Sequence, residues 1–355
     1  MTRSKARDRA AGFCGRYGLS IPILESPMAG ANSTSRAAAI SQSGGLGGLG
    51  ALLLTPEQIA AWAAEFRARG GTRFQINLWI PEPAPVRDRD HEASVRAFLS
   101  HWGPAVPEDA GNAVPLDFAA QCDALLAAQP TIASSIMDLY PESFVRELKA
   151  NGIAWFATVT TLAEARAAQI AGADAVIAQS FEAGGHRGAF DNAAAEQQAI
   201  GMLSLLPRLA DNIDIPIIAA GGIGDARGIA AALTLGASAV LIGTALLRTP
   251  ESQTPNAWAD ALPTAEPENT APTRAFSGRL GRALATDYVR AANAARPAPY
   301  PVQRGLTAGM REDAVRANDV NRMQAWAGQS AWMASDEPAG EFVTRIWRGA
   351  EELLP

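Results

Sequence analysis

Eight short, mostly apolar segments alternate with helix-like segments along the first 250 residues or so, and this alternation constrains the fold more than any other feature. Each segment ends at Gly, Pro or a polar residue, as expected for a strand buried on both faces. The segments are Ile21–Ser26, Gly48–Leu53, Phe74–Trp79, Thr131–Met137, Trp155–Val159, Ala175–Gln179, Pro216–Ala220 and Ala239–Ile242. Eight such units predict an α/β fold, the (β/α)8 TIM barrel, and only the count of eight separates it from an open, doubly wound sheet.

Helix start signals follow several of these segments. Thr55 stands before Pro56, which places a capping residue ahead of a proline at the first helical position. Pro141-Glu142, Thr161 to Glu164 and Asp225 to Gly228 predict helix starts after the fourth, fifth and seventh strands.

Two regions interrupt the alternation. Residues 81–115 are rich in proline and charge and follow the third strand, where ligand-facing loops of a barrel emerge, so we expect a rim insertion. Residues 249–325 carry prolines and short helical patches, which predicts a smaller, mostly helical lobe covering the barrel mouth. The barrel itself is predicted over 15–248, and 326–355 is expected to pack back on it as a helical segment.

Composition narrows the function. The 355 residues are 48% hydrophobic and carry a formal net charge of -6 with both signs interspersed, so neither nucleic acid nor a membrane surface is an expected partner. Cys14 and Cys122 stand alone, which indicates unpaired thiols in a reducing compartment. Met1 to Ala11 is charged and no uninterrupted apolar segment follows it, so we expect no signal peptide and a cytoplasmic location.

His186 is the strongest candidate for catalysis. It lies in a glycine-rich loop, with Gly184, Gly185 and Gly188, directly after the sixth predicted strand. Glycines let a ligand approach the main chain closely, and an imidazole titrates near neutral pH. The residue therefore has the setting of an active-site base.

Glycine clusters also end the last two predicted strands. Ala220 is followed by Gly221, Gly222 and Gly224, and Ile242 by Gly243 and Thr244. In barrels, the loops after strands seven and eight often bind phosphate through free backbone amides and a helix N-terminus. Without a sugar-phosphate motif, these clusters indicate a flavin mononucleotide (FMN) site.

One glycine motif has a different explanation. Gly45, Gly47 and Gly50 spell GxGxxG, but they precede a strand, and the next helix starts only at Pro56. We interpret them as glycines that let the second strand enter a crowded barrel wall.

Several segments together resemble the nitronate monooxygenase family, formerly called 2-nitropropane dioxygenases, in order and spacing. They are Pro27-Met28-Ala29-Gly30 with Ser33-Thr34, Gly44 to Gly47, Phe74 to Leu78, Gln179 to Gly188, Ala219 to Ile223, Gly243-Thr244 and Trp326 to Gln329. Glu182 to Gly188 resembles the class I branch in particular.

The resemblance implies an FMN enzyme that oxidises alkyl nitronates, such as propionate 3-nitronate, with O2 to a carbonyl compound and nitrite, without a metal. Asn77 and Gln179 would hydrogen-bond the isoalloxazine ring, and His186 would act as the base or hold the substrate anion. Cofactor binding would involve Pro27, Met28, Ala29, Asn77, Gln179, Gly184, Gly185, Gly221, Gly222, Gly243 and Thr244. Spacing alone singles out neither Asn77 nor Gln179.

Two other functions stay open at this point. An FMN-dependent NAD(P)H reductase, acting on an enoyl-acyl carrier or a quinone, would use similar glycine loops, and a non-catalytic flavin-binding protein is a more distant alternative. Contacts to substrate from Glu182, Arg187, Arg279, Tyr288 or Tyr300 are also undecided, as is the oligomeric state.

Overall fold

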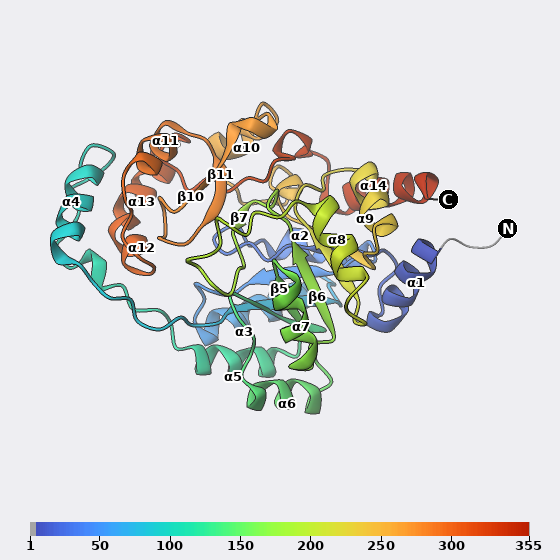
Figure 1. Cartoon of the computed structure of the whole chain (residues 1–355). Coiled ribbons are helices and arrows are strands. Elements are labelled where there is room, and N and C mark those ends of the chain that lie inside the picture. Colours follow the sequence, from blue (N-terminus) through green and yellow to red (C-terminus); the bar gives the residue numbers. More distant parts are fainter. Residues whose placement is uncertain (1–4, 355) are drawn as a thin grey trace.

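Eight parallel strands form a barrel in the computed structural model, which describes residues 5–354 (Figure 1). They are β1 (Ile23–Glu25), β2 (Gly47–Gly50), β3 (Phe74–Trp79), β4 (Ile132–Ile136), β5 (Ala154–Val159), β6 (Ala175–Gln179), β8 (Ile217–Ala220) and β9 (Ala239–Ile242). The strand order is β1-β9-β8-β6-β5-β4-β3-β2, and the ring closes where Leu24 pairs in parallel with Leu46, just before β2. The predicted (β/α)8 fold is confirmed.

Helices surround the barrel. They are α2 (Thr34–Gln42), α3 (Pro56–Ala68), α5 (Phe118–Ala128), α6 (Glu142–Ala150), α7 (Leu162–Ile170), α8 (Met202–Ala210) and α9 (Ala226–Thr234). The C-terminal helix α14 (Ala339–Leu353) packs against both α9 and α2, so it takes the place of the helix that β9 lacks. Thr55, Thr161 and Asp225 cap their helices as predicted, the first two within capping boxes.

The amino-terminal helix α1 (Lys5–Tyr17) covers the amino ends of the strands. Its Phe13 and Tyr17 pack against Phe156, with ring centroids 6.1 and 5.1 Å away, together with Ala175 and Ala239 at the starts of β6 and β9. This apolar plug fills one end of the barrel and leaves the carboxyl ends of the strands for a site.

Close packing explains the glycines of β2. A Cβ on Gly48 would lie 2.5 Å from the carbonyl oxygen of Glu25, and one on Gly50 would lie 2.6 Å from the amide nitrogen of Ala29. The strand is shorter than predicted, because the chain turns away after Gly50 and carries Leu52 and Leu53 to the cavity described below.

The region after β9 contains more than helices. Besides α10 (Asn256–Ala261), α11 (Asp287–Ala294), α12 (Val302–Leu306) and α13 (Ala308–Arg316), it holds an antiparallel sheet of β10 (Thr270–Thr273), β11 (Gly281–Leu284) and β7 (Gly185–His186). The third strand, β7, comes from the loop after β6. A barrel loop that carries the candidate base is thereby hydrogen-bonded to the lobe.

The insertion after β3 lies beside this lobe. Its helix α4 (Arg89–Leu99) places Val95 and Leu99 in an apolar cluster with Phe276 and Tyr288, and Figure 1 shows it next to α11 to α13. The insertion therefore supports the outside of the lobe, and the exact domain boundaries stay predictions.

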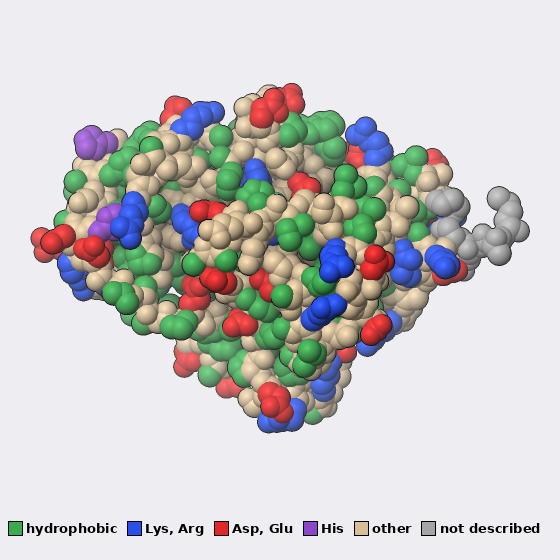
Figure 2. Space-filling view, viewed as in Figure 1, with side chains coloured by type: hydrophobic (Ala, Val, Ile, Leu, Met, Phe, Trp, Pro, Cys, Tyr) green, Lys and Arg blue, Asp and Glu red, His purple; other side chains and the backbone are tan. Residues whose placement is uncertain are grey.

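The surface agrees with the interspersed charge of the sequence. Basic and acidic side chains alternate over the face shown in Figure 2 without a large patch of one sign. Both cysteines are buried and unpaired, and burial raises the pKa of Cys14 to about 11 and that of Cys122 to about 12. Within residues 5–354, none of the helices has the length and apolarity that crossing a membrane requires.

Candidate active site

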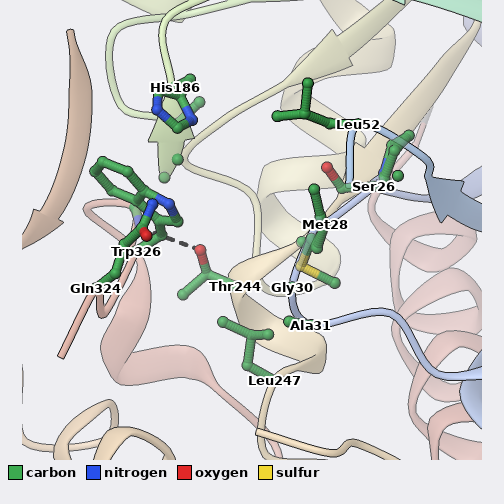
Figure 3. A pocket seen from close by; sticks show the side chains of 18 of the residues that line it. Ser26, Met28, Gly30, Ala31, Leu52, His186, Thr244, Leu247, Gln324 and Trp326 are labelled. Atoms are coloured by element: carbon green, nitrogen blue, oxygen red, sulfur yellow. Dashed lines mark hydrogen bonds between the residues drawn. The ribbon is translucent and has the colours of Figure 1, made fainter. Parts of the chain in front are cut away.

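A cavity of about 580 Å³ lies at the carboxyl ends of the barrel strands. Every residue predicted for cofactor binding or catalysis lines it: Pro27, Met28, Ala29, Asn77, Gln179, Gly184, Gly185, His186, Gly221, Gly222, Gly243 and Thr244. Figure 3 shows His186 and Trp326 on one wall, Ser26, Met28 and Leu52 on the opposite wall, and Thr244 between them. The fold thus collects residues separated by more than 200 positions, while their individual roles stay predictions.

Free backbone amides form a cradle in the wall of the cavity. Gly221 and Gly222 have φ angles of +107° and +69°, in the left-handed region that favours glycine. Within residues 5–354, the amides of Gly221, Gly222, Gly243 and Thr244 donate no backbone hydrogen bond. Four unpaired donors among the residues that line one cavity are suited to an anion such as a phosphate.

The helix after β8 contributes less to this cradle than the sequence suggests. Asp225 caps α9 by accepting a hydrogen bond from the Gly228 amide at 3.1 Å, and it also pairs with Arg227. A carboxylate therefore already occupies the helix terminus. The glycine turn, rather than the helix dipole, is what the structure offers to an anion.

The C-terminal tail forms one wall of the cradle. A Cβ on Gly184 would lie 2.5 Å from the amide nitrogen of Gly328 and 2.9 Å from Thr244 Oγ1. Gly328 donates to Thr244 Oγ1 at 3.1 Å, and Ser330 Oγ donates to the carbonyl of Gly222 at 2.7 Å. Gly328 and Ser330 are therefore additional candidate cofactor contacts that the sequence did not indicate as such.

Several contacts hold His186 in place. Its backbone pairs with Gly281 of β11, and its Nε2 lies 2.7 Å from Ser277 Oγ. The rings of Trp79 and Trp326 meet the imidazole edge-to-face, with centroids 4.8 and 4.7 Å away. Little freedom is left for the ring to rotate.

The charged groups that shift the pKa of His186 are all positive. Burial, followed by the guanidinium groups of Arg279, Arg304 and Arg311, lowers the pKa of His186 to about 3. At neutral pH the imidazole is therefore uncharged, and as a proton acceptor it is weaker than an ordinary histidine.

Two of these arginines line the cavity from α12 and α13. Arg311 donates to Thr307 Oγ1, Gln324 Oε1 and the carbonyl of Arg304 at 3.0 to 3.2 Å. The guanidinium of Arg304 has no hydrogen-bond or ion-pair partner within residues 5–354. Burial lowers the pKa of both groups, that of Arg311 to about 10, so both stay charged at neutral pH. Glu312 also lines the cavity, but Arg304, Arg311 and Arg316 outnumber it, so this part of the cavity suits an anion.

Gln179 and Asn77 border the cavity while making bonds within the protein. Gln179 Nε2 donates to the carbonyl of His186 at 2.9 Å, and its Oε1 accepts from the amide of Gly188 at 2.7 Å. Asn77 Nδ2 donates to the carbonyl and hydroxyl oxygens of Ser134 at 3.2 and 3.1 Å. Both polar atoms of the Gln179 side chain therefore hold the loop that carries His186, in addition to any contact with a cofactor.

A buried ion pair underlies the loop that carries Met28 and Ala29. Arg36 Nε donates to Glu25 at 2.6 Å, and its other nitrogens donate to the carbonyl of Ala31 at 2.7 Å and to Ser252 Oγ at 2.8 Å. Glu25 also accepts from the amide of Gly48 at 2.8 Å. We call this set the Arg36 network; it fixes one wall of the cavity to β1, β2 and the segment after β9.

The other polar residues considered from the sequence have protein partners. Arg187 donates to the carbonyls of Gln179 and Gln198, Glu182 accepts from the amide of Met202, and neither residue lines the cavity. Arg279 pairs with Glu82 at 2.8 Å, Tyr288 is fully buried, and the ring of Tyr300 lies 5.9 Å from that of Trp79. These side chains support the site from outside the cavity.

Comparisons with known proteins find relatives over nearly the whole chain. The family model described as nitronate monooxygenase matches residues 17–349. A probable nitronate monooxygenase from Staphylococcus aureus is 31% identical over 338 residues, which is 94% of this chain and 95% of that protein. The structure of nitroalkane oxidase from Streptomyces ansochromogenes superposes with a TM-score of 0.87 at 33% identity, covering 95% of this chain and 98% of that one. FabK from Thermotoga maritima superposes with a TM-score of 0.75 at 26% identity, covering 99% and 97%.

Proposed function

The chain belongs to the nitronate monooxygenase family, a family of flavin-dependent oxidoreductases, and we propose that it uses FMN to oxidise alkyl nitronates with molecular oxygen, producing a carbonyl compound and nitrite. The observation that supports this most directly is the composition of one cavity. The same cavity is lined by a cradle of free amides, by a neutral histidine and by the arginines Arg304 and Arg311.

The cavity suits FMN. The amides of Gly221, Gly222, Gly243 and Thr244 would hold the single phosphate, and the apolar side chains of Met28 and Ala29 would border the flavin ring. Bound FMN would supply the electron transfer between nitronate and oxygen, for which the side chains alone have no equivalent.

The side chains near His186 suit a small anion. A nitronate is negatively charged, and Arg304 offers a guanidinium group that has no partner within residues 5–354. Trp79 and Trp326 line the same cavity against His186 and would help to exclude water from it. These residues would bind and orient the anion, and His186 would contact it from the ring nitrogen that Ser277 does not engage.

The test is turnover by the purified, flavin-bound protein. Propionate 3-nitronate with oxygen is expected to release nitrite, while NADH added without oxygen is expected to leave the flavin absorption unchanged. His186→Asn is expected to keep the flavin and lose most of the turnover, because the shorter amide cannot reach both Ser277 and the cavity.

Two results would contradict the proposal. Rapid bleaching of the flavin by NADH without nitrite release would assign the chain to the reductase alternative. Full nitrite release by His186→Asn would show that this residue has no part in the reaction.

A further inference from the structure

A neutral histidine carries one ring proton, and the nitrogen that carries it decides what the residue offers to a ligand. With the proton on Nε2, His186 would present a proton acceptor to the cavity through Nδ1. With the proton on Nδ1, it would present a hydrogen-bond donor. The partner of Nε2 determines which form is present.

That partner is Ser277, which is only 1% exposed. Its hydroxyl oxygen accepts a hydrogen bond from the Arg279 amide at 3.3 Å, and its single proton has two possible acceptors. The carbonyl of Arg279 is 3.4 Å away, at the limit of a hydrogen bond, whereas His186 Nε2 is 2.7 Å away, at the usual length of a bond donated by a hydroxyl.

We propose that Ser277 is a positioning residue that donates to Nε2 of His186, so that the imidazole presents Nδ1–H to the cavity. The imidazole ring is also prevented from flipping about its Cβ–Cγ bond. Trp79 and Trp326 contact it, and Gln179 and the β7–β11 pairing hold its backbone. A turned ring would lose the bond to Ser277, so tautomer and orientation stabilise each other.

This inference rests on the proposed function and specifies the form of its substrate. An N–H group beside Arg304 and Arg311 donates to an anionic oxygen and cannot accept a proton at the same nitrogen. In this form His186 takes no proton from the α-carbon, so we expect the substrate to bind with its α-carbon already deprotonated. The nitronate anion, rather than the neutral nitroalkane, is the form that this site accepts.

Nitrogen-15 NMR of the flavin-bound protein reports the tautomer directly. The chain has only three histidines, and comparison with His186→Asn identifies the signals of His186. The expected spectrum has a protonated, pyrrole-type Nδ1 and an unprotonated, pyridine-type Nε2. A protonated Nε2 in the wild-type protein would overturn the proposal, and this measurement needs no turnover.

Variants of Ser277 connect the tautomer to binding. Ser277→Ala is expected to shift the tautomer towards protonated Nε2 and to raise KM for the nitronate roughly two- to tenfold, the effect of one neutral hydrogen bond, with a smaller change in kcat. Ser277→Thr, which keeps the hydroxyl, is expected to restore both. Ser238→Ala, at a buried serine near the amino end of β9, is the matched control.

The outcomes separate the two proposals. If the predicted tautomer is present and no nitronate is oxidised, the proposed function fails and the role of Ser277 stands. If Ser277→Ala changes neither the tautomer nor KM, the role of Ser277 is refuted even in an active enzyme. If Ser277→Ala does not fold, the wild-type spectrum still decides the tautomer.

Discussion

Replacing Arg36 by methionine is expected to destabilise the protein strongly and to loosen the cavity wall that Met28 and Ala29 form. The substitution removes hydrogen bonds to Glu25, to Ser252 and to the carbonyl of Ala31. Glu25 is then left at 0% exposure with the Gly48 amide as its remaining side-chain partner. Breaking a buried ion pair in this way costs about 3–5 kcal/mol of the free energy of unfolding.

The loss should depend on pH in a defined direction. Burial raises the pKa of Glu25, and Arg36 opposes that rise. Without Arg36 the folded-state pKa of Glu25 rises further, so the variant is most stable below the ordinary carboxyl pKa and loses stability as the pH increases through the folded-state value. The deficit relative to wild type is therefore expected to be smaller at pH 5 than at pH 8.

Urea unfolding followed by circular dichroism at both pH values measures this effect. Arg69→Met is the matched control, because Arg69 and Glu65 form an exposed pair worth at most about 1 kcal/mol. The double variant Arg36→Met with Glu25→Gln, which leaves no buried charge, is expected to recover part of the loss. A deficit below about 1 kcal/mol for Arg36→Met, or a double variant less stable than the single one, would refute the reasoning.

Two further substitutions test two parts of the cavity wall, the cradle and the arginines. Gly184→Ala would place a methyl group 2.5 Å from the Gly328 amide nitrogen, so the purified variant is expected to contain less flavin by visible absorption. Gly12→Ala, where a Cβ would meet no atom of another segment within 4 Å, is the control and should retain its flavin. Equal flavin content in the two variants would contradict the role of this contact. Arg304→Met is expected to raise KM for the nitronate about tenfold or more with flavin content unchanged, since hydrogen bonds to a charged group are worth about 1.5–3 kcal/mol. Arg290→Met, in an exposed pair with Asp287, is its control, and an unchanged KM for Arg304→Met would remove the anion-binding role.

The features predicted correctly from the sequence depend on short stretches of chain. Buried parallel strands are recognisable as short apolar runs. Helix starts are recognisable from the capping residues Thr55, Thr161 and Asp225, because a cap acts on amides only two or three residues away. Because eight parallel strands close into a barrel, their carboxyl ends meet at one rim, which brings the glycines after β8 and β9 near His186.

Other predictions needed adjustment because distant segments compete for the same space. The chain turns after Gly50, so β2 ends before Leu53, and the lobe includes a sheet whose third strand is borrowed from a barrel loop. Neither feature has a local signal, since both depend on which segment lies alongside.

By itself, the sequence determined the barrel, the position of the cavity and the glycines that end β8 and β9 in its cradle, because local patterning and chain order decide these; the part of the cradle that Gly328 and Ser330 form came only from the folded tail. The state of His186 was decided only by the tertiary structure. Ser277, Arg304 and Arg311 lie about 90 to 125 positions further along the chain, and only the folded lobe brings them to the imidazole. Protonation depends on burial and on charges nearby in space, so no spacing along the chain could reveal a histidine pKa of about 3.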